Sequence, residues 1–310
     1  MVKFFCVLCC LPLFLCGVES DVLFKYISGS PALVGYADLA AIRGSWLEND
    51  LRELNSKLVA SAGGFYDFSE DFEDFSSAAV AFYEPLHPKN QRLLLRGGLE
   101  PKDFFSMLEN SSGTVLRRTA ADGAPAAVFP AESVNRKLRG SFEPAAIALE
   151  PDVFFVGDLA TGTGLLSGKS GSAAVPAAFS GAPDDAFLLA SLTPSRFPAA
   201  AAFVRGVDLV LLSAHFTDAE SVEVIGRVSC ADVKTAAAMS VNLQMLAVTM
   251  IPALMPDDRA LAAKLVSGLK VAADGKTVNL NWICPRELAG LVIKYCTSAP
   301  VPSEVSARIQ

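Results

Sequence analysis

The chain has 310 residues, with 33 acidic and 26 basic side chains and a formal net charge of −7. Its hydrophobic content of 52% and mean hydropathy of +0.39 exclude a disordered protein, because disordered chains are polar and rich in charge. The length allows one large domain or two ordinary ones. The acidic balance argues against nucleic-acid binding, which depends on clustered lysine and arginine. The two histidines, His87 and His215, provide little material for a histidine metal site or a catalytic triad.

The N-terminus has the pattern of an export signal. Lys3 precedes an uncharged, apolar run over residues 4–15, and small residues follow at Val18 and Ser20. A basic residue, such a run and a small-residue site are typical of a secretory signal peptide. The run is shorter than the roughly 20 apolar residues of a membrane-spanning helix. We therefore expect a signal peptide at residues 1–20, cleavage near Ser20, and an exported protein of the periplasm or cell envelope.

Lipidation at Cys16 is the alternative. The sequence Leu13-Phe14-Leu15-Cys16-Gly17 resembles a lipoprotein box, whose cysteine would carry the lipid. Leu15 stands where such boxes have a small residue, and this favours plain cleavage. Attachment to a membrane is expected only if the protein is lipidated at Cys16.

The first half of the mature chain is predicted to alternate strands and short helices. Ser45 and Asp158 are suited to cap helices, Pro101 fits a first helical turn, and Asp122-Gly123 is typical of a hairpin turn. Apolar runs and helical spacing indicate the other elements. The expected strands are residues 32–39, 78–83, 92–96, 115–119, 126–129, 145–149 and 153–156, and the expected helices are residues 45–58, 100–108 and 158–168.

The second half repeats this order of elements. Turns are expected at Thr217-Asp218 and Asp274-Gly275, and a long helix is expected to break near Pro252 and Pro256. The expected strands are residues 186–192, 207–215, 221–229, 269–272 and 277–283, and the expected helices are residues 194–204, 231–267 and 285–295.

This repetition predicts two similar units, at residues 21–168 and 185–298. Residues 169–184 are rich in Gly, Ser, Ala and Pro and form the expected linker, and residues 299–310 are expected to be a disordered tail. Because the strands come as adjacent hairpins, the predicted fold class is α+β, with antiparallel or mixed sheets and helices packed on one face.

The cysteines allow one disulfide prediction. Removal of the signal leaves Cys230, Cys284 and Cys296, and an odd count suggests one bridge and one free thiol. A helix over residues 285–295 would hold Cys284 and Cys296 about 15 Å apart, beyond the reach of a disulfide. Cys230 and Cys284 each lie where a strand gives way to a helix, so their sulfurs meet if those strands run parallel. The alternative is three buried, reduced thiols.

Motifs that would carry chemistry lack residues that they need. A phosphate-binding loop ending at Gly168 needs a glycine where Thr163 stands, and the nearest candidate for a serine nucleophile, Ser170, lacks the second glycine of its turn. The acidic residues within 67–74 lack the spacing of a calcium loop, and the phenylalanines among them are expected to enter the core. We therefore predict no catalytic, metal or cofactor residues, and no cofactor.

Residues 233–255 form the most unusual segment. One stripe at helical spacing is apolar, and the adjacent side is apolar too, through Val241, Met245, Val248 and Ile251. Such a helix is expected to be buried on two sides, either between a sheet and its neighbour or over a ligand. Methionines form adaptable linings, so the predicted lining of a hydrophobic pocket is Met239, Leu243, Leu246 and Met250. Polar residues argue against a membrane span: Asp232, Lys234, Asn242 and Gln244.

Residues 222–291 resemble uncharacterised exported bacterial proteins built from tandem α+β units. The resemblance rests on Cys230-Ala231-Asp232 opening an alanine-rich helix, on the hairpin at Asp274-Gly275-Lys276-Thr277-Val278, and on Pro285-Arg286-Glu287-Leu288 after the last strand. In the first half it extends to Val34-Gly35-Tyr36-Ala37-Asp38-Leu39 and Val156-Gly157-Asp158. These motifs are structural, so the resemblance implies the fold and export and transfers no catalytic residue.

The expected function is a non-enzymatic binding or interaction protein that is exported. Its partner would be a protein or a hydrophobic small molecule, with no nucleic acid. The alternative is a carrier of a hydrophobic or lipid-like ligand that uses the methionine-rich helix over residues 231–255. An enzyme of unrecognised type is the third hypothesis.

Overall fold

The computed structural model describes residues 22–27, 29–53, 72–83, 88–130, 142–167, 179, 182–196, 205–254, 259–287 and 289–290. The predicted signal peptide, the predicted disordered tail and most of the predicted linker lie outside these residues, as does His87.

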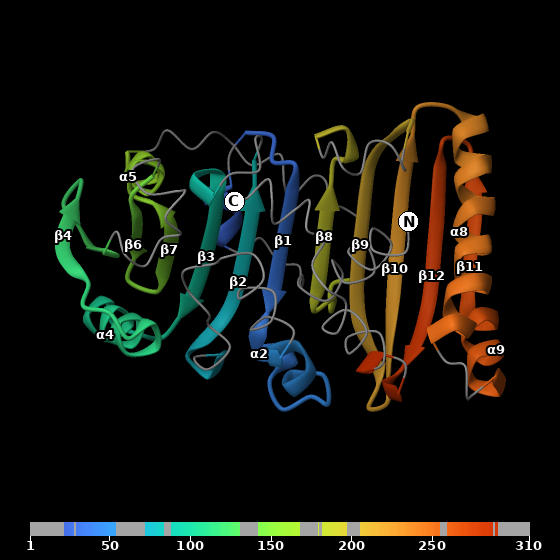
Figure 1. Cartoon of the computed structure of the whole chain (residues 1–310), viewed down its shortest axis with the longest axis horizontal. Helices are drawn as coiled ribbons and strands as arrows, with labels where there is room; N and C mark the ends of the chain where they lie inside the picture. The colour runs from blue at the N-terminus through green and yellow to red at the C-terminus, as the bar shows by residue number, and fades with distance from the viewer. Residues whose placement is uncertain are drawn as a thin grey trace.

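The strands form one antiparallel sheet of 12 strands (Figure 1). Adjacent strands run antiparallel throughout. Across the sheet the order is β11 (Leu269–Asp274), β12 (Thr277–Pro285), β10 (Ser221–Cys230), β9 (Val207–Asp218), β8 (Leu188–Leu192), β1 (Leu33–Asp38), β2 (Phe75–Phe82), β3 (Gln91–Gly97), β7 (Val153–Asp158), β6 (Pro144–Glu150), β5 (Ala124–Val128) and β4 (Arg117–Ala121).

The longer helices with both ends in the described residues are α4 (Pro101–Ser112), α5 (Leu159–Leu166), α8 (Val233–Leu254) and α9 (Arg259–Gly268). The shorter elements are α2 (Leu39–Ile42) and the 3₁₀ turns η2 (Val22–Tyr26), η3 (Phe72–Asp74), η4 (Pro88–Asn90) and η6 (Pro194–Arg196). With these strands the protein belongs to the α+β class, as predicted.

Local signals placed several elements correctly. The Asp158 carboxylate accepts a hydrogen bond from the Thr161 N–H at 3.2 Å and caps α5. Asp122 and Gly123 have φ values of 50° and 86°, so they form the left-handed turn that joins β4 to β5. These two predictions are confirmed because each depends on residues close together in the chain.

Other boundaries differ from the prediction. The turn between β9 and β10 follows Asp218, whose carboxylate accepts hydrogen bonds from the Glu220 N–H and the Ser221 hydroxyl, each at 2.7 Å. The strand expected at residues 78–83 is β2, which begins earlier, at Phe75, whose fully buried ring packs edge-on against Phe104. The break expected near Pro252 and Pro256 is found, because α8 ends at Leu254, two residues after Pro252, and α9 begins at Arg259. Pairing with the neighbouring strand extends β9 and β2 beyond their predicted bounds.

The predicted disulfide is wrong for the same kind of reason. Cys230 and Cys284 are both free and buried. Strands β10 and β12 run antiparallel, and Cys284 lies opposite Val222, eight residues from Cys230. At about 3.4 Å per residue the two cysteines are roughly 27 Å apart, far beyond disulfide reach. Parallel strands were the condition for the bridge, and β10 and β12 do not meet it.

Helices pack on both faces of the sheet, which corrects the expectation of a single covered face. The ring of Phe104 on α4 stacks on Phe154 at 4.1 Å between centroids. A side chain on Gly162 of α5 would instead meet Phe155. Neighbouring residues of a strand point to opposite faces, so α4 and α5 lie on opposite sides of β7. In the second half α8 and α9 share one face, because both pack against the same side of β12.

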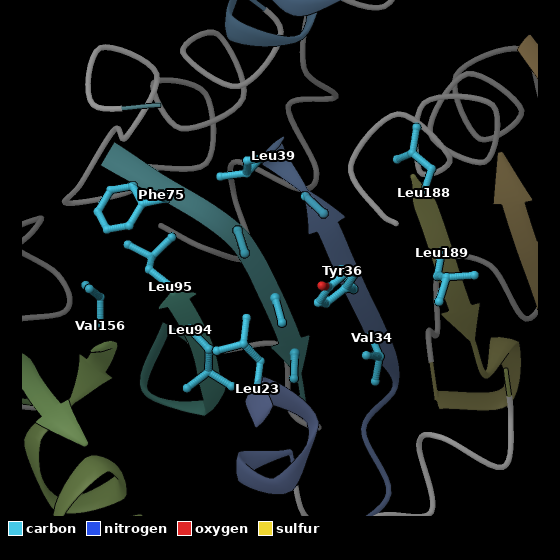
Figure 2. Packing of buried hydrophobic residues seen from close by; sticks show 14 of the residues in the cluster. Leu23, Val34, Tyr36, Leu39, Phe75, Leu94, Leu95, Val156, Leu188 and Leu189 are labelled. Carbon is cyan, nitrogen blue, oxygen red and sulfur yellow. The ribbon is translucent and has the colours of Figure 1, made fainter. Parts of the chain in front are cut away.

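A large apolar core joins the two halves of the chain (Figure 2). It includes Leu23 from η2, Leu94 and Leu95 from β3, and Leu188 and Leu189 from β8. Strands β1 and β8 pair directly, with Leu33 opposite Leu192, so the sheet is continuous between the halves. A second, smaller cluster runs from Leu33 of β1 and Leu192 of β8 to the residues beneath α8.

Candidate functional site

Helix α8 begins at a capped end and runs over the last strands of the sheet. The Asp232 carboxylate accepts a hydrogen bond from the Thr235 N–H at 2.7 Å. This bond and a side-chain bond from Thr235 lower the pKa of Asp232, with a smaller contribution from Lys276. The helix packs mainly against β11, and also against α9, β12 and β10. Figure 1 shows α8 at the end of the sheet, over β11.

The side of α8 that faces the sheet is narrow and built mostly from small residues. Its buried positions are Ala236, Ser240, Leu243, Ala247 and Ile251, at spacings of three and four. Leu243 belongs to the cluster that contains Val271 of β11 and Val278 of β12. Small side chains bring the helix close to the strands but remove little apolar surface from water.

The outer side of α8 is apolar and exposed. The exposed fractions are 59% for Val233, 57% for Val241, 60% for Met245 and 53% for Val248. These four residues are called the apolar face below. The prediction that α8 is buried on two sides is therefore wrong. Among the described residues, one helix, Val233–Ala253, is long and apolar enough to cross a membrane, judged by length and composition alone.

Two of the polar side chains of α8, Gln244 and Thr249, bond within the protein, whereas Lys234 and Asn242 are exposed. The Gln244 side-chain N–H donates to the carbonyl oxygen of Val271 in β11 at 3.0 Å. The Thr249 hydroxyl donates to carbonyl oxygens of its own helix, at 2.8 Å to Met245 and 3.1 Å to Leu246. One N–H of Gln244 and the Thr249 hydroxyl therefore keep their hydrogen bonds if an apolar partner covers the face, which lowers the cost of covering it.

The four residues predicted to line a pocket do not share one environment in the structure. Leu243 is buried against the sheet, whereas Met239 and Leu246 are half-buried. Met239 packs on the same cluster as Leu243. The side chain of Met250 lies outside the described residues. A ligand pocket beneath α8 therefore stays a prediction. The exposed Val241, Met245 and Val248 were recognised in the sequence as apolar, but helical spacing does not reveal what covers a face.

His215 and the two described cysteines are buried or paired within the sheet. His215 Nε2 lies 3.0 Å from Glu223 Oε2 on the neighbouring strand, and Asn281 donates to the other oxygen of Glu223. Burial raises the pKa of the Cys284 thiol to about 12, and burial with nearby Asp208 raises that of Cys230. In the described part of the chain, no three His, Cys, Asp or Glu side chains gather as a metal site would need.

Comparisons with known proteins show the fold and nothing more specific. No family model matches the chain, and no curated protein matches it. Two solved structures, crystal forms III and I of TP0453, match with a TM-score of 0.54 and 11% sequence identity. The matches cover 88% and 90% of this chain and 97% and 98% of TP0453. The architecture is therefore shared along nearly all of both proteins, while at this identity the likeness carries no function.

Proposed function

We propose that the protein is a non-enzymatic, exported binding protein that contacts its partner through the apolar face of α8. The exposed Val233, Val241, Met245 and Val248 carry this proposal. Burial of a valine or methionine side chain contributes about 1.5–3 kcal/mol, so an apolar row left in water favours association. Apolar patches of this kind mark interaction surfaces in soluble proteins.

Helix α4 provides an internal comparison that supports a special role for α8. Both helices directly follow a strand pair, β2–β3 or β9–β10. The outer side of α4 is polar, with exposed Lys102, Asp103, Ser106, Asn110 and Ser111. Its inner side is buried through Phe104, Phe105 and Leu108. A helix that follows a strand pair in this fold therefore does not need an apolar outer side, because that of α4 is polar. This contrast favours a binding role for the apolar face of α8.

We further propose that residues 21–168 and 185–298 are two related units. In the first, strands β1, β2 and β3 are adjacent, and after a helix β7 returns beside β3. In the second, strands β8, β9 and β10 are adjacent, and after two helices β12 returns beside β10. The hairpin β4–β5 is an addition to the first unit. This strand order supports the tandem arrangement that the sequence predicted.

Export is proposed from the sequence of residues 1–20. Intact mass and N-terminal sequencing of the protein from an envelope fraction are expected to show a chain that begins near Asp21. A chain that begins at an acylated Cys16 would replace plain cleavage by lipidation. A chain that retains Met1 and the signal would contradict export.

The apolar face is tested with the dye 1-anilinonaphthalene-8-sulfonate, whose fluorescence rises on apolar surfaces. Lysine at both Val241 and Met245 is expected to reduce the dye signal severalfold, because charge replaces the central part of the face. Val115→Lys is the matched control, since this valine is 86% exposed elsewhere on the protein. An unchanged signal in Val241→Lys/Met245→Lys, with native circular dichroism, would contradict the proposal.

A further inference from the structure

Among the described strands β11 is an edge of the sheet, and its outward backbone groups can be assigned from its register. Asp274 lies opposite Thr277 across a turn of two residues. In such a hairpin the closing pair exchanges hydrogen bonds, and bonded positions then alternate along the strand. Lys270, Ala272 and Asp274 therefore bond to β12. The N–H and C=O groups of Leu269, Val271 and Ala273 point away from β12, towards the open edge.

The side chain of Gln244 already bonds to one of these outward backbone groups. Its side-chain amide donates to the carbonyl oxygen of Val271 at 3.0 Å. In a wider sheet, the peptide N–H of the next strand would make this bond. The contact shows that an amide donor reaches the edge and that α8 extends over it.

The apolar face borders the same edge. Val241 lies three residues before Gln244 and Val248 four residues after it, so all three lie on one side of α8. That side reaches the edge of β11, as the Gln244 contact shows. The open edge and the exposed apolar side chains thus form one surface, with hydrogen-bonding groups below and an apolar wall above.

We propose that this surface binds an extended segment of a protein partner, which adds as a strand to β11 beneath α8. The inference rests on the proposed function and names its class of partner. A peptide N–H of the segment replaces the Gln244 amide on Val271, and every second side chain packs against Val241 and Val248. Strand addition of this kind draws its affinity from the backbone and its specificity from alternate side chains.

Charges on the other face of β11 specify the segment further. Lys270 and Asp274 are exposed and lie on the face opposite to Val271. Opposite charges facing each other across strands are favourable, and like charges are not. The segment therefore carries an acidic residue opposite Lys270 and a basic residue opposite Asp274, four positions apart.

Other occupants fit this surface less well. If two copies paired β11 to β11 antiparallel, both α8 helices would lie on the same face, held close to the strand spacing of about 4.8 Å. Packed helices need about 8–10 Å between axes. A lipid surface offers no row of amide donors and acceptors for the open edge. An extended peptide matches both the backbone groups and the width of one added strand.

The test uses a fluorescent nine-residue peptide, TVKVTVEVT, designed to run antiparallel to β11 with lysine facing Asp274 and glutamate facing Lys270. Anisotropy titration is expected to show saturable binding. Ala273→Pro removes an outward N–H and is expected to weaken binding at least about tenfold, the equivalent of one good hydrogen bond. Gln244→Ala removes the competing amide and is expected to tighten binding.

Ala120→Pro is the matched control, because Ala120 lies at the corresponding outward position next to the turn of the opposite edge strand, β4. It is expected to leave peptide binding unchanged. Equal binding by the two proline variants, or no binding by the unmodified protein, would overturn strand addition. Sedimentation without peptide that shows a dimer abolished by Ala273→Pro would assign the edge to a second copy and would also overturn it.

The dye assay separates this inference from the proposed function. If the dye still responds to Val241→Lys/Met245→Lys while the peptide fails to bind, the apolar face stands and strand addition does not. If the dye does not respond to those substitutions, the proposed function itself fails. Lys270→Glu or Asp274→Lys alone is expected to weaken binding of the peptide TVKVTVEVT. The double variant Lys270→Glu/Asp274→Lys is expected to recover binding with the charge-exchanged peptide TVEVTVKVT.

Discussion

Cys230 and Cys284 lie at opposite ends of the antiparallel pair β10–β12, with buried and unlinked thiols. In the native protein, alkylation followed by peptide mass spectrometry is therefore expected to leave both residues unmodified, because burial raises both pKa values and shields the sulfurs. Both are expected to react in denaturant without prior reduction. A recovered Cys230–Cys284 peptide pair would contradict the structure.

The Cys284 thiol makes the stability depend on pH in the alkaline range. Its pKa is raised from 9.0 to about 12 in the folded protein. The unfolded chain therefore releases the proton first, and stability is expected to fall as pH rises above about 9. Chemical denaturation at several pH values measures the fall. Cys284→Ala is expected to reduce this slope, and an identical slope in the variant would contradict the assignment.

Phe104 and Met245 are expected to differ strongly in their effect on stability. Phe104 is fully buried and stacks on Phe154, so Phe104→Ala is expected to cost about 3–5 kcal/mol of unfolding free energy. Met245 is 60% exposed, so Met245→Ala is expected to change stability by about 0.5 kcal/mol or less. Urea titrations followed by circular dichroism compare the two. A large cost at Met245 would show that the apolar face is covered within the monomer.

Two glycines of α5 offer a test of close packing. A Cβ on Gly162 would lie 2.5 Å from Ile147 Cδ1 and 2.7 Å from the Phe155 ring, so Gly162→Ala is expected to destabilise by about 1–3 kcal/mol. A Cβ on Gly164 would meet no atom within 4 Å. Gly164→Ala is therefore expected to stabilise the helix by about 0.5–1 kcal/mol. Thermal melts of the two variants should shift in opposite directions, and parallel shifts would contradict the packing.

The Asp232 cap is expected to weaken in acid. Hydrogen bonds from Thr235 lower its pKa below 3.8, so the ionised carboxylate stabilises the start of α8. This contribution is present above the usual pKa of aspartic acid and is lost as pH falls through the lowered value. The hydrogen-exchange protection factors in the first turn of α8, which compare the observed rate with the intrinsic rate at each pH, are expected to fall in Asp232→Ala and to become nearly independent of pH. Unchanged protection would contradict the cap.

Much of the fold could be predicted from the sequence, and the successes share a cause. The Asp158 cap and the Asp122-Gly123 turn depend on groups within a few residues of one another. Strands β2 and β3 are apolar runs with the length and alternation of strands. Such local patterns restrict the backbone whatever the rest of the chain does, so they can be recognised without knowing the fold.

Features that depend on distant segments were harder to predict. The bridge between Cys230 and Cys284 required a strand direction that neither segment encodes. Phe154 and Phe155 of β7 point to opposite faces of the sheet, and both are buried. Helix α4 covers Phe154 on one face, and α5 covers Phe155 on the other. The Gln244 contact with Val271 joins residues 27 positions apart in sequence. The spacing of residues within one segment does not indicate which distant residues that segment contacts.

The sequence by itself determined the α+β class, most strand positions, and the apolar character of the helix that begins after Asp232. Only the tertiary structure decided that β11 is an edge and that Val241, Met245 and Val248 lie in solvent. The physical reason is that hydrophobic spacing indicates which side chains gain from burial, whereas the cover each receives depends on where the rest of the chain packs. In α8 the sheet covers one side, and the apolar face remains for a partner.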